Sequence, residues 1–443
     1  MKPGWKSQRV DAGTFPLIPR LGWMRKLAVL SMHTSPLAQP GTGDGGGMNV
    51  YVRELSSALA RGGVTCDVYT RRWSTELPDV VAVEPGFAVH HVAAGPPIAV
   101  AKETLQDHVE EFTESVINRM TGPPHSTLGA SDAPADAIHA NYWLSGLAGH
   151  AIKHRLGLPL VSTFHTLDRV KAEASPEEVE SAEPSRRARA ESEIIGCSDA
   201  LLASCSVEVD QLVELYGADR ERVEVVPLGV DHAFFSPGDR AHARRAIGLA
   251  GEGPLLLFVG RIQPLKGAEV ALQAFEILVQ SIPSAQLVIV GGPSGPRGEA
   301  EVAMLYSMVE TLGLEERVRF VAPQPHELLS TYYRAADCCL VPSRSESFGL
   351  VALEASACGT PVVAAAVGGL TTLVRHGRTG YLVDNGDAGA YARFAADICT
   401  DPLLQAELGA CGASMAAGYS WSITAGRLRR LYTDLTSRSL VEC

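Results

Sequence analysis

Two basic residues stand at a position where a phosphorylated ligand would bind. The segment GRIQPLKG (260–267) places Arg261 and Lys266 directly after the apolar run LLLFVG (255–260). In open α/β sheets, ligands bind beyond the carboxyl ends of the strands. Arg can hold two oxygens at once and Lys supplies a point charge, and a departing diphosphate develops negative charge that such donors stabilise. The pair predicts a diphosphate site, although these two residues alone also fit a solvated basic turn.

A second motif supplies two carboxylates. Glu346 and Glu354 stand eight positions apart in SESFGLVALEASACGTPVVAA (345–365), after the apolar run CCLVPS (338–343). We expect Glu346 to open a helix, with Phe348 and Gly349 in its first turn and Glu354 about two turns further on the same face. Carboxylates accept hydrogen bonds from sugar hydroxyls. Because the helix around Glu354 is apolar, that carboxylate needs partners of its own.

The third feature is a glycine-rich loop, GTGDGGGMNVYV (41–52), that leads into a helix. Glycine lets a phosphate approach the backbone closely, and amides at a helix N-terminus bind phosphate. The loop satisfies GxGxxG from Gly41 to Gly46, with Asp67 about 20 residues on, which is the dinucleotide fingerprint. That interpretation is disfavoured because residues 33–40 separate the glycines from the preceding strand. A flexible loop is a further alternative, and a catalytic loop between two domains is favoured.

These residues need strands and helices to position them, and the chain alternates short apolar runs with helical patterns. Such alternation is typical of parallel sheets covered by helices on both faces. Strands are predicted at 26–32, 64–70, 136–140, 159–164, 200–205 and 223–228, and then at 255–260, 286–292, 319–323, 338–343 and 361–366. A polar linker, 229–251, divides the two series. We therefore expect two α/β domains whose strand ends face each other across a cleft.

The predicted boundaries follow from this pattern. Residues 1–23 form a disordered extension, 24–230 the N-terminal domain, 231–415 the C-terminal domain, and 416–443 a final segment with a basic helix at 421–435. We expect that helix to pack back on the N-terminal domain.

Composition excludes several classes of protein. The 443 residues carry a net charge of −12, which argues against a non-specific nucleic-acid binder. No run approaches the roughly 18 apolar residues of a membrane span, and residues 1–23 lack the apolar core of a signal peptide. The nine cysteines are scattered without CxxC spacing. They predict reduced thiols in a cytoplasmic protein, with neither a disulfide framework nor a zinc site.

The motifs together resemble those of a known superfamily. The segment from Glu346 to Glu354 resembles the E-x7-E motif of retaining glycosyltransferases with two Rossmann-like domains (the GT-B fold). GRIQPLKG resembles their donor-phosphate motif, and GGLTTLVRHGRTGYLV (368–383) their C-terminal signature. The resemblance covers about residues 25 to 435. It implies a UDP-sugar donor and front-face attack without a protein nucleophile, with Arg261, Lys266 and the Gly47 amide holding the departing diphosphate.

The same resemblance assigns the rest of the donor site. It implies that His165 contacts the donor sugar or carries part of the developing positive charge, although a satisfied core histidine is the alternative. Glu346 would bind sugar hydroxyls, Glu354 the ribose, and Gln324 would lie where the backbone contacts uracil. With no DxD motif in the sequence, no catalytic metal or other cofactor is expected. Backbone carbonyls from Tyr333 to Ala336 are a candidate site for a structural Mg²⁺.

The first domain narrows the resemblance to one family. SMHTSPLAQPGTGDGGGMNVYV (31–52), YWLSG (142–146) and FHTL with Lys171 closely resemble the D-inositol-3-phosphate glycosyltransferases of mycothiol biosynthesis. These enzymes transfer N-acetylglucosamine from its UDP form to inositol phosphate. The resemblance assigns the acceptor to five residues: Lys102, Tyr142, Thr166 and Arg187 for its phosphate, and Asn49 for an inositol hydroxyl.

Several alternatives stay open at this point. HANYWLSG stands here where the family usually has HSHYWLSG, and the stretch after FHTL also departs from the family pattern. A relative that glycosylates another polyol phosphate, or one like sucrose-phosphate synthase, would also fit. A nicotinamide-dependent oxidoreductase and a sugar-nucleotide-binding protein without turnover are the more distant readings. The sequence also leaves open whether the protein forms a homodimer.

Overall fold

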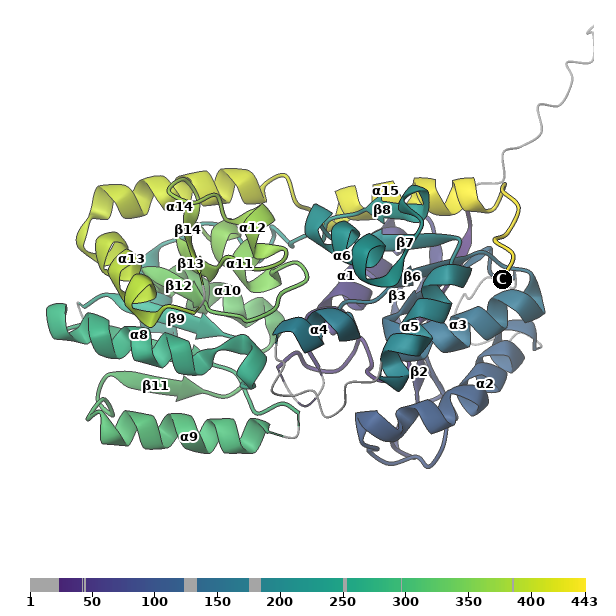
Figure 1. The fold of residues 1–443 in the computed structure, drawn as a ribbon, viewed down its shortest axis with the longest axis horizontal. Helices are drawn as coiled ribbons and strands as arrows, with labels where there is room; N and C mark the ends of the chain where they lie inside the picture. Colours follow the sequence, from purple (N-terminus) through teal and green to yellow (C-terminus); the bar gives the residue numbers. More distant parts are fainter. Residues whose placement is uncertain are drawn as a thin grey trace, which may run out of the picture.

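The protein forms two α/β domains that lie side by side (Figure 1). The computed structural model describes residues 24–41, 43, 45–122, 134–174, 185–249, 253–295, 297–384 and 386–443. The predicted extension, 1–23, lies outside the described residues. No helix in the described part of the chain is long and apolar enough to cross a membrane.

The N-terminal domain is built on an eight-stranded sheet in the order β3-β4-β2-β1-β5-β6-β7-β8. All neighbours pair in parallel except the edge strand β3, which is antiparallel to β4. The strands are β1 (Lys26–Leu30), β2 (Thr65–Arg71), β3 (Val80–Glu84), β4 (Phe87–Val92), β5 (Ala137–Asn141), β6 (Leu160–Thr163), β7 (Ala200–Ala203) and β8 (Val223–Val225). The central strands are buried along their length because helices cover both faces.

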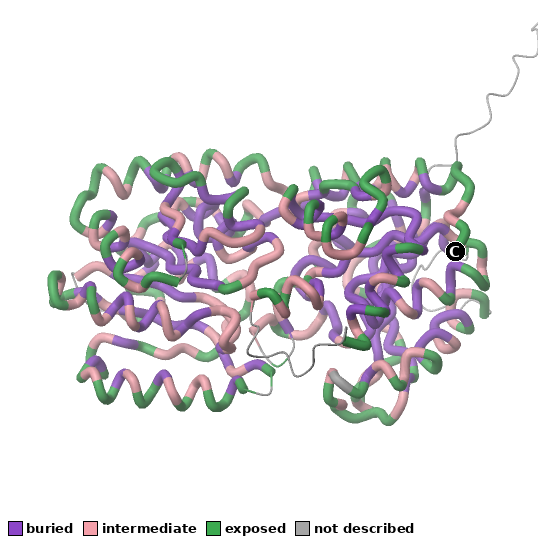
Figure 2. Tube along the Cα trace, viewed as in Figure 1, coloured by how far each residue is buried: buried purple, intermediate pink, exposed green. Residues whose placement is uncertain are grey.

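The C-terminal domain carries a six-stranded parallel sheet in the order β11-β10-β9-β12-β13-β14. This is the strand order of dinucleotide-type doubly wound folds, and the order reverses between β9 and β12. The strands are β9 (Leu255–Val259), β10 (Gln286–Val290), β11 (Val318–Val321), β12 (Cys338–Val341), β13 (Val362–Ala365) and β14 (Gly380–Val383). The two sheets hold the buried core, and the outer helices alternate buried and exposed positions (Figure 2).

Helices cover both sheets. In the first domain they are α1 (Gly47–Arg61), the 3-10 helix η1 (Lys102–His108), α2 (Val109–Thr121), α3 (Tyr142–Leu156), α4 (Asp168–Ala174), α5 (Arg186–Cys197) and α6 (Ser206–Tyr216). In the second they are α7 (Arg240–Ala246), η4 (Pro264–Lys266), α8 (Ala268–Ser281), α9 (Gly298–Thr311), α10 (His326–Ala335), α11 (Leu350–Ala357), α12 (Leu370–Leu373), α13 (Ala388–Thr400) and α14 (Pro402–Ala416).

The last helix, α15 (Trp421–Leu435), returns to the first domain (Figure 1). It packs against α1, and its Tyr432 hydroxyl lies 2.8 Å from Nδ1 of the buried His139 in β5. Just before it, Ser420 pairs with Val230 in an isolated bridge. The chain therefore crosses between the domains twice at one place, at Val230 and at Ser420.

The structure differs from the sequence prediction in three regions of the chain. The segment 229–251 is not a plain linker, because it contains α7 and buries Phe235 in the second domain's core. Strands β3 and β4 were missed, since β3 is a half-buried edge and β4 carries two histidines in its apolar pattern. Strand β14, a partly buried edge strand that begins with a glycine, was also missed.

Candidate active site

The carboxyl ends of the strands from both domains meet at one large cavity. Its volume is about 1030 Å³, and residues of both domains line it. Tyr142 follows β5 and His165 follows β6, while Arg261 and Glu346 follow β9 and β12. Tyr142 (φ 73°) and His165 (φ 61°) are the non-glycine residues with positive φ in the described chain. Such backbone strain is typical of functional sites.

The basic residues of the predicted diphosphate site lie on the second domain's wall of this cavity. Lys266 Nζ is 2.5 Å from Glu346 Oε2, so the two predicted groups form an ion pair. Arg261 lies against the glycine loop of the first domain, where a Cβ on Gly46 would be 3.3 Å from Arg261 Nε. Gly47 begins α1, whose first amides have no partner within the helix. Cations and helix amides thus face one space, as a diphosphate requires.

The glycine loop is not a dinucleotide turn. Gly41 has φ 88°, and its Cβ position faces Pro323 of the other domain at 3.1 Å. Gln39 Nε2 also donates to the Pro323 carbonyl at 2.9 Å. The loop therefore packs across the cleft and only then enters α1, in agreement with a loop placed between two domains.

The position of Lys266 depends on the next residue. Gly267 has φ 69°, and a Cβ there would lie 2.2 Å from the Pro342 carbonyl oxygen. Gly217 has nearly the same backbone, φ 67°, but nothing lies within 4 Å of its Cβ position. The two glycines share the left-handed conformation and differ only in crowding.

We expect Gly217→Ala to cost about 1–2 kcal/mol of stability, because a side chain disfavours the left-handed region. Gly267→Ala should cost about 1–3 kcal/mol more, since the carbonyl must move, and should lower kcat/KM at least about 10-fold by displacing Lys266. Urea denaturation and steady-state kinetics measure both. Equal losses in the free energy of unfolding for the two variants would show that the Pro342 carbonyl moves aside at no cost.

The two glutamates differ from the prediction in their elements. Helix α11 begins at Leu350 after Gly349 (φ 105°), so Glu346 lies in the preceding loop and does not open the helix. Gly368, which follows β13, packs against that loop, because its Cβ position is 1.9 Å from the Glu346 carbonyl oxygen. The Glu346 carboxylate nevertheless lines the cavity, held there by Lys266.

Glu354 is buried and has the partners that its surroundings require. His326 Nε2 lies 2.6 Å from Glu354 Oε1, and the Tyr333 hydroxyl donates to Oε2 at 2.8 Å. Although burial opposes it, the Glu354 carboxylate raises the pKa of His326. The carboxylate remains at the cavity wall, where a ribose hydroxyl could bind to it.

Gln324 lines the same end of the cavity and donates to the Ala322 carbonyl at 2.9 Å. The nearby segment from Tyr333 to Ala336 ends α10. Its Tyr333 carbonyl accepts a hydrogen bond from Thr360 Oγ1 at 2.6 Å, and its Ala335 carbonyl accepts one from Arg244 Nε at 3.0 Å. Both carbonyls are thus already used within the protein, and Mg²⁺ binding there stays a prediction.

His165 joins the two walls of the cavity. Its Nε2 lies 2.9 Å from Asn141 Oδ1, and its carbonyl accepts a hydrogen bond from the Ser347 hydroxyl of the second domain. Burial, with a smaller contribution from His139, lowers the pKa of His165 to about 3. The imidazole is therefore neutral near pH 7 and acts as a hydrogen-bonding group rather than a fixed cation.

This lowered pKa predicts a loss of stability in acid. Unfolded histidine takes up a proton below about pH 6.5, whereas folded His165 does so only near pH 3. His165 therefore stabilises the fold above pH 6.5, and this stability is lost as pH falls toward 3, by about 1.4 kcal/mol per pH unit. Urea denaturation of the parent and His165→Gln should show slopes that differ by this amount between about pH 6 and 4. The exposed His242→Gln is the control, and slopes equal to the parent's in both variants would contradict the assignment.

The predicted acceptor residues converge on the first domain's wall around the Tyr142 ring. Lys102 Nζ and Arg187 Cζ lie 4.7 and 4.8 Å from the ring centroid. Arg187 donates to the Tyr142 hydroxyl at 3.1 Å and to Thr166 Oγ1 at 3.1 Å. The fully buried Glu191 accepts from Arg187 Nε at 2.7 Å and fixes the guanidinium. Two cations and two hydroxyls thus gather on this wall of the cavity.

Asn49 is the exception among the predicted site residues. Its side chain is buried and accepts from the Gly46 amide at 2.8 Å. Its amide nitrogen donates to Thr34 Oγ1 and the Ser35 carbonyl, both at 2.6 Å. Asn49 does not line the large cavity. These hydrogen bonds connect the first turn of α1 to the loop before it, and an inositol contact by Asn49 stays a prediction.

Comparisons with known proteins agree with this geometry. The family model described as glycosyl transferases group 1 matches residues 239–415, and the glycosyl transferase 4-like domain matches 46–229. A D-inositol 3-phosphate glycosyltransferase of Actinosynnema mirum is 45% identical over 92% of this chain and 97% of its own. The chain belongs to the D-inositol 3-phosphate glycosyltransferase family. A relative of that name from Acidothermus cellulolyticus is 44% identical over 93% of this chain and 90% of its own.

Solved structures place this family member in the GT-B fold. Sucrose-phosphate synthase from Thermosynechococcus elongatus superposes with a TM-score of 0.82 at 33% identity, over 93% of this chain and 99% of that one. Anabaena HepE, solved with UDP and glucose, superposes with a TM-score of 0.70 at 20% identity, over 92% and 99%. The predicted fold class and the glycosyltransferase assignment are confirmed, and the oxidoreductase alternative is excluded.

Sequence reasoning missed some residues that the glycosyltransferase fold brings to the site. His33 lines the cavity, with its ring centroid 4.4 Å from that of Tyr142. Its buried Nδ1 has no hydrogen-bond partner among the described residues, and burial followed by Lys102 keeps its pKa well below the usual value. The signal was present, because His33 lies three residues after the end of β1. His326 and Tyr333, the partners of Glu354, carried no such signal.

Proposed function

We propose that the enzyme transfers N-acetylglucosamine from UDP-N-acetylglucosamine to D-inositol 3-phosphate with retention of anomeric configuration. The observation that carries this proposal is one cavity with two separate cationic sites. Arg261 and Lys266 lie on one wall, and Lys102 and Arg187 lie on the other. The first pair suits a diphosphate and the second a phosphate monoester. The names of the relatives indicate the acceptor, D-inositol 3-phosphate.

The geometry supports a front-face reaction. The acceptor hydroxyl attacks the anomeric carbon on the side from which the diphosphate departs, and a diphosphate oxygen takes its proton. Arg261, Lys266 and the first amides of α1 stabilise the charge that develops on the leaving group. Glu346 and Glu354, the carboxylates of the motif, are each held by partners. That arrangement suits binding of hydroxyls better than nucleophilic attack.

The experiment is a matrix of donors and acceptors with UDP release as the readout. UDP-N-acetylglucosamine, UDP-glucose and UDP-galactose are each combined with inositol 3-phosphate, inositol 1-phosphate, fructose 6-phosphate and free inositol. We expect the highest kcat/KM for UDP-N-acetylglucosamine with inositol 3-phosphate, and an α-linked product by NMR. Faster UDP release with fructose 6-phosphate would contradict the acceptor, and a β-linked product would contradict retention. Binding of UDP without release from any pair would indicate a protein without turnover.

A further inference from the structure

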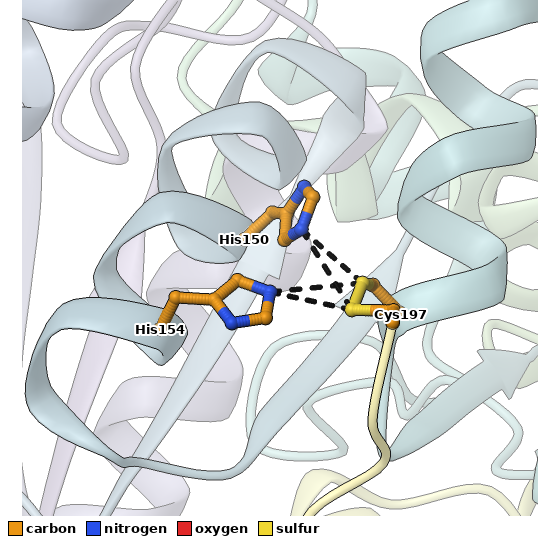
Figure 3. Close-up of side chains that lie close together, drawn as sticks. His150, His154 and Cys197 are labelled. Atoms are coloured by element: carbon orange, nitrogen blue, oxygen red, sulfur yellow. Dashed lines mark hydrogen bonds between the residues drawn. A yellow bond between two sulfur atoms is a disulfide. The ribbon is translucent and has the colours of Figure 1, made fainter.

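Four side chains with metal-binding atoms gather in the first domain, and none of them lines the cavity. His150 and His154 stand one turn apart on α3, and Cys197 ends α5 (Figure 3). Cys443 belongs to the segment after α15. Their ligand atoms all lie within 4.8 Å of one another. The expectation of reduced thiols is wrong for two of the cysteines in this structure, because Cys197 and Cys443 meet across 246 positions and their sulfurs are joined.

The two imidazoles point at both sulfurs. His150 Nε2 lies 3.2 Å from Cys197 Sγ and 3.8 Å from Cys443 Sγ. His154 Nε2 lies 3.9 and 3.3 Å from the same two atoms. A disulfide needs no such partners, whereas two thiolates and two imidazoles form a complete set of ligands for zinc.

The separations match those of a tetrahedral ion. Zinc binds sulfur at about 2.3 Å and nitrogen at about 2.0–2.1 Å, which places neighbouring S and N ligands roughly 3.6 Å apart. The four S···N distances, 3.2 to 3.9 Å, lie around this value. The sulfurs must separate to about 3.8 Å to admit the ion. Cys443 can move, because it is exposed and lies in a segment outside any helix or strand.

The surroundings also fit a metal site. Metal-binding histidines usually donate their second ring nitrogen to a carboxylate, which fixes the ring. His150 Nδ1 faces Glu193 Oε1 at 3.4 Å. The terminal segment is held beside Cys197 by a second contact, in which the Val441 amide donates to Asp199 Oδ1 at 2.7 Å. The Val441 hydrogen bond therefore helps to hold Cys443 beside the other three ligands, in addition to the contacts of its own sulfur.

We propose that His150, His154, Cys197 and Cys443 form a tetrahedral zinc site that ties the C-terminal segment to α3 and α5. The same two helices carry acceptor residues at their other ends. Tyr142 begins α3, about 12 Å from His150, and Arg187 stands about 15 Å from Cys197 along α5, at a rise of about 1.5 Å per residue. The metal would fix the relative position of the two helices that hold the acceptor residues.

The test measures zinc and thiols on the same untagged full-length protein. Zinc content is determined by plasma mass spectrometry after desalting, and thiols are counted without reductant in denaturant and EDTA. We expect about one zinc per chain and all nine cysteines as thiols. Cobalt replacing the zinc should give thiolate charge-transfer bands and the intense visible bands of tetrahedral Co²⁺.

Variants assign the metal to these residues. His150→Ala, His154→Ala and Cys443→Ser should each lower zinc content at least about 10-fold, as expected when a ligand is lost. The matched controls are His242→Ala, on the surface of α7, and Cys411→Ser, a partly exposed thiol on α14, and both should keep their zinc. Cys443→Ser is the decisive variant. Because Cys443 is exposed and lies outside any helix or strand, a loss of metal in this variant cannot be attributed to misfolding.

Several outcomes would overturn the proposal. Seven thiols without zinc would show that Cys197 and Cys443 form a disulfide, since seven other cysteines are free. Nine thiols without zinc would leave a cluster of reduced ligands only. Zinc that persists in His154→Ala and Cys443→Ser would place the metal elsewhere.

Discussion

Replacing Lys266 with alanine is expected to lower kcat/KM at least about 100-fold, because a donor that stabilises the departing diphosphate is lost. Lys266 lines the cavity at the end of β9, and its ammonium lies 2.5 Å from Glu346 Oε2. The effect should fall mainly on kcat, since negative charge on the diphosphate grows in the transition state. Initial rates of UDP release over a range of donor concentrations separate kcat from KM.

Two further variants show whether the charge itself acts on the substrate. Glu346→Gln removes the partner of Lys266 but keeps the cation, so its effect should appear in donor-sugar selectivity more than in the UDP-release rate. Arg430→Ala removes an exposed cation on α15 and should leave both constants unchanged. A Lys266→Ala rate within about threefold of the parent would identify Lys266 as a structural partner of Glu346 and no more.

The sequence predicted the fold well because its strands are buried parallel strands. LAVL in β1 and LLLFV in β9 are continuous apolar runs. Such runs can be recognised as buried strands without knowing which strands pair with them. The site followed from the same logic, since chemistry at the carboxyl ends of strands identifies ligand-binding residues. Arg261 and Lys266 were identified in this way, whereas His165 was assigned by the resemblance, and the roles of all three residues stay predictions.

Pairings between distant segments could not be predicted from sequence. The apolar helix around Glu354 showed that this carboxylate needs hydrogen-bond partners, but the sequence could not identify them as His326 and Tyr333. For Asn49, which the resemblance assigned to an inositol hydroxyl, the sequence could not show that the side chain is hydrogen-bonded to the Gly46 amide. Cys197 and Cys443 have no local spacing at all, and only the return of α15 to the first domain brings them together.

The acceptor site should discriminate strongly between inositol 3-phosphate and free inositol. Lys102 and Arg187 both lie within 4.8 Å of the Tyr142 ring centroid, and a phosphate monoester carries close to two negative charges at neutral pH. Each charged contact contributes about 1.5–3 kcal/mol, so two predict a kcat/KM ratio of roughly 100 to 20,000 in favour of the phosphate. Competition and single-substrate assays of UDP release measure this ratio directly.

The double variant Lys102→Ala, Arg187→Gln should bring that ratio toward one by lowering kcat/KM for inositol 3-phosphate while leaving the weak activity on inositol unchanged. Glutamine is chosen at 187 because it can still hydrogen-bond to the buried Glu191, which accepts from Arg187 in the parent, whereas alanine would leave that carboxylate without a partner. UDP affinity, measured by calorimetry, should stay at the parent value because the donor cations lie on the opposite wall. Lys102→Ala alone should lower kcat/KM for inositol 3-phosphate by about 10- to 150-fold, which is the effect expected from losing one charged contact. Comparable parent activity on inositol and inositol 3-phosphate would contradict the phosphate site while leaving the glycosyltransferase intact.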